Sequence, residues 1–278
     1  MRTIEITTKV GCRVACKYCP QNVFIEAYSL RSNIMTMELD LFKRCLKNIP
    51  EDYYIVFSGF CEPWLNPDCL KMILHASKNN FRVSVFTTLL GVKEEDIEIL
   101  QNIQLHTFWV HLPSNDKLEN LTVDHKYISV LNKLISSKIP ASYHIHGKSL
   151  HDKIILPDNI LVINEGICDR AGTTNLKACF PNQPQNNNLG SISCIRGMHQ
   201  NVLLPNGDVA LCCMDYELKH ILGNLADSKL KSLYSSREYR TVLKGLSNKS
   251  VDIICRKCNF ASGSSLNRRI MSMIGISH

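Results

Sequence analysis

Short apolar runs alternate with amphipathic segments over the first 165 residues of the chain. Six runs rich in β-branched and aromatic residues are typical of strands, at residues 3–8, 54–58, 82–88, 107–112, 141–146 and 160–163. Between them, residues 37–48 and 67–79 have apolar side chains at i, i+3, i+4 spacing, which predicts helices with one buried face. Six strand–helix units are fewer than the eight of a closed barrel. We therefore expect an α/β fold, a partial (βα)6 barrel open on one side.

The pattern changes after residue 170. The stretch 172–190 is rich in Asn, Gln, Thr and Pro and lacks periodicity, which predicts a connecting loop. Two β-rich runs, 201–204 and 209–211, flank Pro205-Asn206-Gly207-Asp208, a turn sequence that predicts a β-hairpin. Residues 228–246 have the apolar spacing of one amphipathic helix. The predicted parts are a core (1–170), a connecting loop (171–193), a C-terminal region of hairpin plus helix (194–262) and a tail (263–278).

Composition narrows the class of protein. A chain of 278 residues with 45% hydrophobic and 21% charged residues can bury a full core. No apolar run approaches the roughly 18 residues of a membrane span, and the first residues lack the apolar stretch of a signal peptide, so we expect a cytoplasmic protein. The net charge of +7 comes from scattered Lys and Arg, so nucleic acid is unsupported as a partner. An anionic small substrate or a cofactor carboxylate suits this surplus equally well.

Thirteen cysteines in a chain of this size, clustered in short spacings, point to metal or redox chemistry rather than to disulfides. Cys12, Cys16 and Cys19 form a C-x3-C-x2-C motif just after the first predicted strand. That position is the carboxyl end of the sheet, where α/β folds place their sites. Three thiolates on an iron–sulfur cubane leave one iron with an open coordination position. A zinc knuckle or buried free thiols remain alternatives at this point.

A second set of four cysteines lies in the C-terminal region. Cys194 precedes Cys212 by seventeen intervening residues, and Cys255 and Cys258 form a C-x2-C pair after the predicted helix. Four cysteines make a complete ligand set for either an iron–sulfur cluster or a structural zinc ion. Spacing alone does not separate these two.

The first motif, with Tyr18 before its third cysteine, resembles the signature of the radical S-adenosylmethionine superfamily. The resemblance implies that S-adenosylmethionine chelates the open iron and that its reductive cleavage yields a 5′-deoxyadenosyl radical. It also implies a reductant partner such as flavodoxin or ferredoxin.

Further residues match positions that bind the cofactor in this superfamily. Ser58-Gly59-Phe60-Cys61-Glu62-Pro63 resembles its Gly-Gly-Glu-Pro element, which receives the methionine ammonium, although Cys61 stands where glycine is usual. Thr87 and Thr88, ending the third predicted strand, match its polar ribose contacts, and His111 ends the fourth. The resemblance thus implies a cofactor pocket formed by Tyr18, Ser58, Gly59, Cys61, Glu62, Thr87 and Thr88, and the position of His111 at the end of the fourth predicted strand makes it a further candidate for that pocket.

The second set resembles the SPASM region, or its shortened twitch form, which carries auxiliary clusters in this superfamily. Because Cys194, Cys212, Cys255 and Cys258 suffice for one auxiliary cluster, the resemblance implies two 4Fe-4S clusters in all. Among twitch-bearing enzymes the chain is similar to the aminocyclitol dehydrogenases. They have an Arg-Gly-Gly element where this chain has Arg170-Ala171-Gly172, which makes Arg170 a candidate substrate ligand.

This likeness favours oxidation of a sugar or cyclitol alcohol to a ketone, begun by removing hydrogen from the carbinol carbon. An alternative is an epimerase, in which Cys213 returns a hydrogen atom to the opposite face. A third alternative is maturation of a ribosomal peptide, but such maturases usually carry an additional peptide-recognition domain, and the first predicted strand already begins at residue 3. His144 and His146 alternate on one strand and so share one face, where a histidine could act as base.

Overall fold

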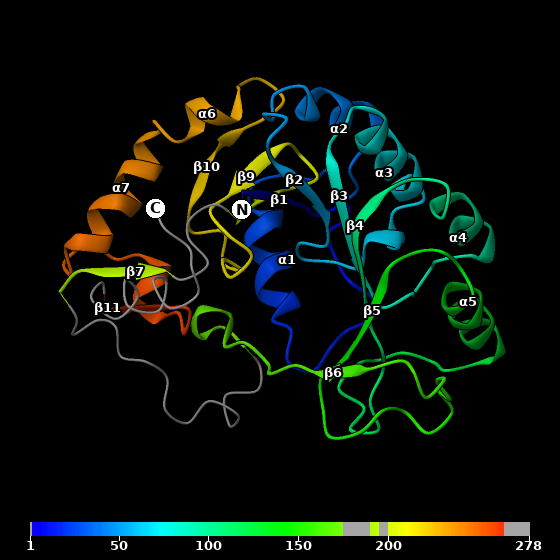
Figure 1. The fold of residues 1–278 in the computed structure, drawn as a ribbon. Helices are drawn as coiled ribbons and strands as arrows, with labels where there is room; N and C mark the ends of the chain where they lie inside the picture. Colours follow the sequence, from blue (N-terminus) through cyan, green and yellow to red (C-terminus); the bar gives the residue numbers. More distant parts are fainter. Residues whose placement is uncertain (1, 175–189, 195–199, 264–278) are drawn as a thin grey trace.

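A nine-stranded sheet forms the centre of the computed structural model, which describes residues 2–174, 190–194 and 200–263. The strand order is β10-β9-β8-β1-β2-β3-β4-β5-β6, so both edges, β10 and β6, are open (Figure 1). This arrangement confirms the predicted α/β class and the open barrel. The strands are β1 (Thr3–Ile6), β2 (Tyr54–Phe57), β3 (Arg82–Thr87), β4 (Leu105–His111), β5 (Ala141–Ile145), β6 (Val162–Asn164), β8 (Gln200–Leu203), β9 (Asp208–Ala210) and β10 (Ile221–Asn224).

The six predicted strands are β1 to β6, which pair in parallel in chain order. Helices α1 (Gln21–Ser29) and α2 (Leu39–Leu46) follow β1, and α3 (Cys69–Lys78), α4 (Glu94–Leu100) and α5 (His125–Ile135) follow the next three strands. Figure 1 shows α2 to α5 along the outer side of the curved sheet. The segment between β5 and β6, which the structure describes throughout, contains no helix.

Helix α2 shows why these segments fold as they do. Its apolar residues Leu41, Phe42, Cys45 and Leu46 are buried, and Phe42 packs on Phe57 of β2 with ring centroids 5.8 Å apart. The polar residues on the other face lie toward solvent, as one-face burial requires. Helices buried in this way hold the sheet from outside and leave the carboxyl ends of the strands free to carry side chains for chemistry.

The predicted hairpin belongs to the main sheet. β8 pairs in parallel with β1 on the side opposite β2, with Ile6 beside Leu203, and β9 and β10 continue the sheet antiparallel. The predicted turn connects β8 to β9, and Gly207 there has φ +90°. A Cβ on Gly207 would lie 2.7 Å from Asn224 Oδ1, so glycine is required at this point of the turn. The hairpin therefore continues the core sheet.

The single helix predicted over 228–246 is wrong, because two helices occupy this stretch. They are α6 (Leu230–Leu233) and α7 (Arg237–Ser247). The Ser236 side chain accepts a hydrogen bond from Tyr239 N at 3.1 Å and so caps the start of α7. Serine is a poor interior helix residue and a favoured N-cap, which explains the break. None of the described helices is long and apolar enough to cross a membrane.

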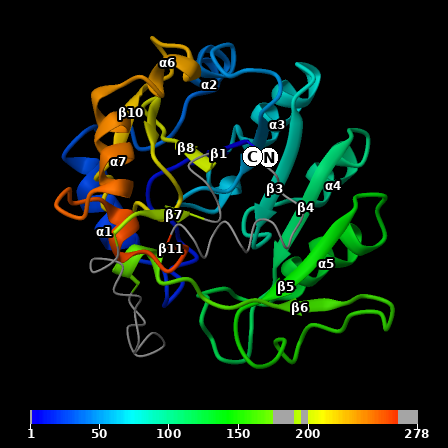
Figure 2. The same ribbon diagram turned by 60° about the vertical axis from the view of Figure 1, so that its left-hand side comes forward.

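The predicted connecting loop, 171–193, is described only at its ends. Arg170–Gly172 forms a 3-10 turn, η2, and Ile192–Cys194 forms strand β7, which pairs with β11 (Ala261–Gly263). Residues 175–189 and all but the first residue of the predicted tail, 263–278, lie outside the described residues. Figure 2 shows β7 and β11 beside α7.

Arg256, between Cys255 and Cys258, links the C-x2-C segment to the C-terminal end of α7. Its side chain is 2% exposed. Its guanidinium donates to Gly245 O from Nε (3.2 Å) and Nη2 (2.6 Å), to Leu246 O from Nη2 (3.3 Å) and to Gly190 O from Nη1 (2.9 Å). The last carbonyls of a helix lack intrahelical partners, and a cation there also opposes the helix dipole favourably. The C-x2-C turn η5 (Ile254–Lys257) is therefore fixed to α7.

Candidate active site

The three cysteines of the first motif meet in the loop between β1 and α1, at the carboxyl end of the sheet. Cys19 N donates to Cys16 O at 2.9 Å, and Ala15, with φ 44°, turns the loop between the first two cysteines. The three thiol groups interact electrostatically with one another. The structure thus brings together Cys12, Cys16 and Cys19 as the spacing predicts.

Hydrogen-bond donors from several elements surround these sulfurs. Glu62 N lies 3.4 Å from Cys12 Sγ, and Gln21 Nε2 lies 3.4 Å from Cys19 Sγ. The hydroxyl of Tyr216 lies 3.6 Å from the same Cys19 Sγ, and it is the donor once that sulfur is a thiolate. Burial raises the pKa of Cys12 to about 11, and it raises that of Cys16 further. Buried thiols of this kind are suited to a ligand that compensates the thiolate charge.

The element after β2 lies directly beside the motif. Ser58 Oγ donates to Glu5 Oε2 at 3.2 Å, and Cys61 Sγ lies 3.6 Å from Thr8 Oγ1. Gly59 has φ +66°, and a Cβ there would overlap Thr7 Oγ1. Ser58, Gly59 and Cys61 thus pack on the end of β1.

Glu62 is a buried carboxylate, 4% exposed, that holds the ends of β2 and β3 together. Thr87 Oγ1 and Trp64 N donate to Oε1 at 2.7 and 3.4 Å. Thr88 N and Thr88 Oγ1 donate to Oε2 at 2.7 and 2.8 Å. Burial raises the pKa of Glu62 although these bonds oppose the shift. Because four bonds fill the acceptor positions of a carboxylate, Glu62 acts here to fix backbone, and the predicted cofactor contacts of Glu62, Thr87 and Thr88 stay predictions.

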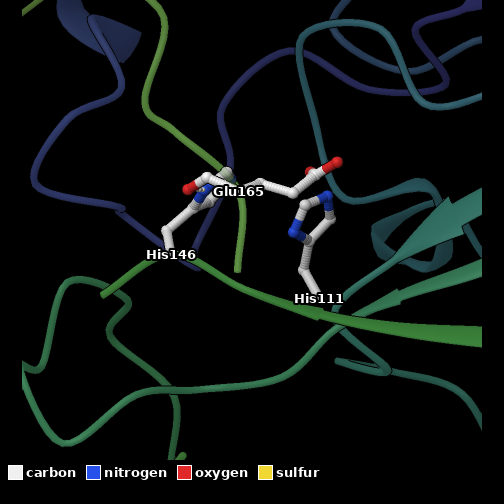
Figure 3. Close-up of side chains that lie close together, drawn as sticks. All are labelled: His111, His146 and Glu165. Atoms are coloured by element: carbon white, nitrogen blue, oxygen red, sulfur yellow. Dashed lines mark hydrogen bonds between the residues drawn. The ribbon is translucent and has the colours of Figure 1, made fainter. Parts of the chain in front are cut away.

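His111, at the end of β4, and His146, just after β5, face Glu165, just after β6. One ligand atom from each of His111, His146 and Glu165 lies within 4.8 Å of the others (Figure 3). His146 Nδ1 lies 3.0 Å from Glu165 O, so it carries the proton and Nε2 has the free lone pair. His111 Nδ1 is buried without a hydrogen-bond partner. Burial lowers the pKa of His111 to about 3, and the charge of Arg170 adds to the shift, so this imidazole is neutral.

Tyr18 connects the histidines to the first cysteine motif. Its side chain is 7% exposed, its ring packs edge-on against His146 with centroids 5.0 Å apart, and its hydroxyl bonds the Cys16 thiol. His144 lies behind the histidine pair, stacked on Trp109 at 3.8 Å, with Nδ1 3.6 Å from Glu165 Oε1. Tyr18, His111 and His146 therefore line one continuous surface at the carboxyl ends of the strands.

The charge of Arg170 interacts with Cys19 of the first cysteine set and with Cys213, which lines the cavity of the second set. The Arg170 guanidinium carbon lies 5.9 Å from the ring centroid of Tyr216, the residue that contacts Cys19. Burial opposes the charge of Arg170, but Tyr216, Cys168, Cys213 and Cys19 hold its pKa above the ordinary value. Cys213 follows the predicted ligand Cys212 directly and is 9% exposed. Residues far apart in the sequence, Cys19 on one side and Cys213 and Tyr216 on the other, therefore lie around Arg170.

The second cysteine set lines one cavity. Its wall contains Cys194, Cys212, Cys255 and Cys258, together with Cys213 and apolar residues such as Leu211, Met214 and Phe260. Burial raises the pKa of Cys255 and of Cys258 to about 12, and Cys194 and Cys255 interact electrostatically. All cysteines among the described residues are free thiols. The chain therefore assembles a four-thiol site in a largely apolar cavity.

The two cysteine sets have the donors of iron–sulfur clusters. Thiolates are the usual ligands of such clusters, and three of them leave one iron of a cubane with an open position whereas four complete a ligand set. Among the described residues, the one group of side chains placed to hold a single ion is His111, His146 and Glu165, which contains no cysteine.

Comparison with known families agrees with this chemistry. Residues 194–259 match the SPASM family, described as an iron–sulfur cluster-binding domain. The match spans all four cysteines of the second set, and it confirms the iron–sulfur prediction for this region. Taken with the barrel, it confirms the resemblance drawn from the sequence: the chain has the fold of the radical S-adenosylmethionine proteins and carries their SPASM region.

Solved structures give particular relatives of this fold. BtrN in complex with AdoMet and 2-DOIA has a TM-score of 0.59 at 16% identity, covering 93% of each chain. AnSMEcpe with bound AdoMet has a TM-score of 0.56 at 16% identity, covering 92% of this chain and 86% of its own. SuiB of Streptococcus suis bound to the precursor peptide SuiA has a TM-score of 0.53 at 14% identity, covering 93% and 69%. Comparison with curated proteins gives no match.

Some functional residues escaped sequence reasoning. Tyr216, Gln21 and Glu165 reach the site through contacts that no local spacing reveals, and Arg256 looked like an ordinary residue inside C-x2-C. The one signal in the sequence was closeness to a cysteine of the two sets, since Tyr216 follows Cys212 by four residues and Gln21 follows Cys19 by two.

Proposed function

We propose that the protein is a radical S-adenosylmethionine dehydrogenase that oxidises a secondary alcohol of a small polar substrate, of sugar or cyclitol type, to a ketone. The observation that carries the proposal is the position of Arg170, whose charge interacts with Cys19 of the first set and with Cys213 beside the second. A substrate held there lies next to both cysteine sets. Oxidation needs that arrangement, because the radical must be generated at the first cysteine set and the remaining electron must be accepted at the second.

Cys12, Cys16 and Cys19 would hold the first cluster, and Cys194, Cys212, Cys255 and Cys258 the second. When bound, S-adenosylmethionine and the first cluster supply a 5′-deoxyadenosyl radical. Tyr18 and His111 would line the cofactor pocket, and backbone after β2, at Gly59 and Cys61, would contact the methionine end. AdoMet in the solved BtrN and anSMEcpe complexes supports this cofactor.

The overall reaction balances without a further oxidant. The alcohol loses a hydrogen atom from carbon, a proton from oxygen and one electron, and the hydrogen atom ends in 5′-deoxyadenosine. His146 would accept the proton, because its Nδ1 donates to Glu165 O and leaves the Nε2 lone pair free. The electron passes to the second cluster and equals the one consumed in cleaving S-adenosylmethionine. A flavodoxin or ferredoxin would supply the first electron.

A second candidate is an epimerase. Cys213 favours it, because this thiol lines the cavity of the second cysteine set and a thiol can return a hydrogen atom to a carbon radical. Peptide maturation is the third reading, supported by the fold shared with SuiB, whose solved complex contains a precursor peptide. A ketone, an epimer and a modified peptide are therefore the products to distinguish.

The test incubates anaerobically reconstituted protein with S-adenosylmethionine, reductant and a panel of cyclitols and sugars in deuterated water. Loss of two hydrogens from the substrate supports oxidation. Deuterium at carbon without other change in composition, abolished in Cys213→Ala, would replace the proposal by epimerisation. Formation of 5′-deoxyadenosine with a peptide only, and with no polyol of the panel, would also overturn it.

A further inference from the structure

Arg170 has a cationic side chain without an acidic partner. No ion pair joins it to any Asp or Glu among the described residues, and every Asp and Glu of the sequence lies in those residues. The charge of Arg170 acts on the neighbouring Asp169, but Asp169 makes no ion pair with it and accepts through Oδ1 from Ala171 N (3.1 Å) and Asn259 N (3.4 Å). Arg170 Nε is buried without a hydrogen-bond partner. A planar fork of N–H donors is thus left unsatisfied.

The backbone holds Arg170 in place at a cost. Arg170, Ala171 and Gly172 have φ values of 50°, 52° and 84°, three successive residues in the left-handed region. For each of the two non-glycine residues this conformation costs on the order of 1 kcal/mol, and such strain persists where surrounding bonds enforce it. Here Thr173 N and Oγ1 donate to Arg170 O at 3.1 and 2.6 Å, and Gly172 N donates to Asp169 O at 3.0 Å. The turn therefore presents an unpaired guanidinium on a rigid base.

The groups around Arg170 supply only part of its counter-charge. Tyr216 offers a ring face, and Cys168, Cys213 and Cys19 offer sulfur, of which Cys19 carries negative charge as a ligand of the first cluster. His111 and His146 are on the same side, since the Arg170 charge lowers the pKa of both imidazoles. Within the described residues, no hydrogen bond joins the guanidinium to an oxygen atom. Arg prefers a carboxylate or phosphate, whose oxygens match its fork in a bidentate pair.

We infer that the substrate carries an anionic group, a carboxylate or a phosphate, and that Arg170 binds it. The inference rests on the proposed function only in taking this space as the substrate site. It narrows the substrate class from neutral polyols to sugar acids or sugar phosphates. The net charge of +7 would attract such an anion over a longer range.

The carboxylate of S-adenosylmethionine is the other source of the same chemistry. The position of Arg170 next to Cys213, on the side of the second cysteine set, favours the substrate. The two sources predict different effects of an Arg170 substitution on cofactor affinity, so binding experiments separate them.

The test measures calorimetric binding to protein reconstituted with both clusters and saturated with S-adenosylmethionine. The probes are D-glucuronate, inorganic phosphate and, as the neutral counterpart, D-glucose. We expect both anions to bind better than glucose, and Arg170→Gln to weaken them at least tenfold while changing S-adenosylmethionine affinity less than twofold. Arg170→Lys keeps the charge and should retain part of the affinity. Arg82→Gln is the matched control, because Arg82 is exposed at the amino end of β3 and, among the described residues, bonds only Tyr54.

Three results would overturn the inference. If neither anion binds wild-type protein better than glucose, the clusters alone balance the positive charge of Arg170, and no anionic substrate group is needed. If Arg170→Gln weakens S-adenosylmethionine as strongly as the anions, the cofactor carboxylate is the partner. If Arg82→Gln has the same effect as Arg170→Gln, only overall charge matters. Iron content and circular dichroism show whether a variant is folded. If Arg170→Gln is misfolded, anion affinity is compared between wild type and Arg170→Lys instead. Anion binding through Arg170 without oxidation would refute the proposed function and leave this inference standing.

Discussion

Replacement of Arg256 by alanine should release the auxiliary cluster selectively. The guanidinium donates to three carbonyl oxygens, those of Gly190, Gly245 and Leu246, and the side chain is 2% exposed. Each buried carbonyl left without its partner costs about 1 kcal/mol or more. Arg256→Ala should therefore ease local opening of the C-x2-C turn by about 3 kcal/mol, which corresponds to a roughly hundredfold larger open population.

The assay follows iron release from reconstituted protein into an excess of a chromogenic chelator. We expect about half of the iron to leave roughly a hundredfold faster in Arg256→Ala, while the half held by Cys12, Cys16 and Cys19 leaves at the wild-type rate. Arg240→Ala is the matched control, since Arg240 is exposed on the same helix. Equal release kinetics in wild type, Arg256→Ala and Arg240→Ala would refute the reasoning, as would acceleration of both halves together.

Three further predictions concern the first motif and the sheet ends. Tyr216→Phe removes a hydrogen-bond donor to Cys19 Sγ, so the reduction potential of the first cluster should fall in an EPR-monitored redox titration. The potential of the second cluster should not change, and the control Tyr28→Phe should leave both potentials unchanged. Burial lowers the pKa of His111 to about 3, so as the pH falls below about 6.5 the unfolded chain binds a proton at this residue before the folded protein does. Protonation of His111 should therefore lower the free energy of unfolding of the apoprotein by about 1.4 kcal/mol at pH 5.5, measured by urea unfolding. This loss should be absent in His111→Gln. Gly59→Ala should lower the urea midpoint clearly, because its Cβ overlaps Thr7 Oγ1 and the bond from Phe60 N to that oxygen would break; an unchanged midpoint would contradict the packing described.

The sequence predicted what local spacing encodes. The six parallel strands, the turn at Gly207 and the two cysteine sets depend on residues close in the chain, so periodicity and motif spacing were enough. The break between α6 and α7 at Ser236 was missed, because apolar spacing continues through it and only the cap reveals it. A longer search for capping residues inside amphipathic runs would have found it.

Side-chain partners were beyond sequence reasoning. Thr87 and Thr88 stand at the predicted end of β3, yet their hydroxyls donate to Glu62, a pairing that depends on the exact approach of two loops. Tyr216 reaches Cys19 across 197 positions of sequence, and nothing local marks that contact. Such long-range pairs follow from how the sheet curves, which strand patterns leave open.

The parallel pairing of β1 with β8 has a consequence for how the protein is made. Thr3 and Gln200 are neighbours in the sheet, so one side of the first strand stays bare while almost two hundred residues are synthesised. Contacts of such sequence separation form late, and a bare strand edge is prone to pair with other chains. This edge of β1 therefore stays unpaired until residues 200–203 have been synthesised, and a fragment ending ahead of β8 would retain the exposed edge permanently.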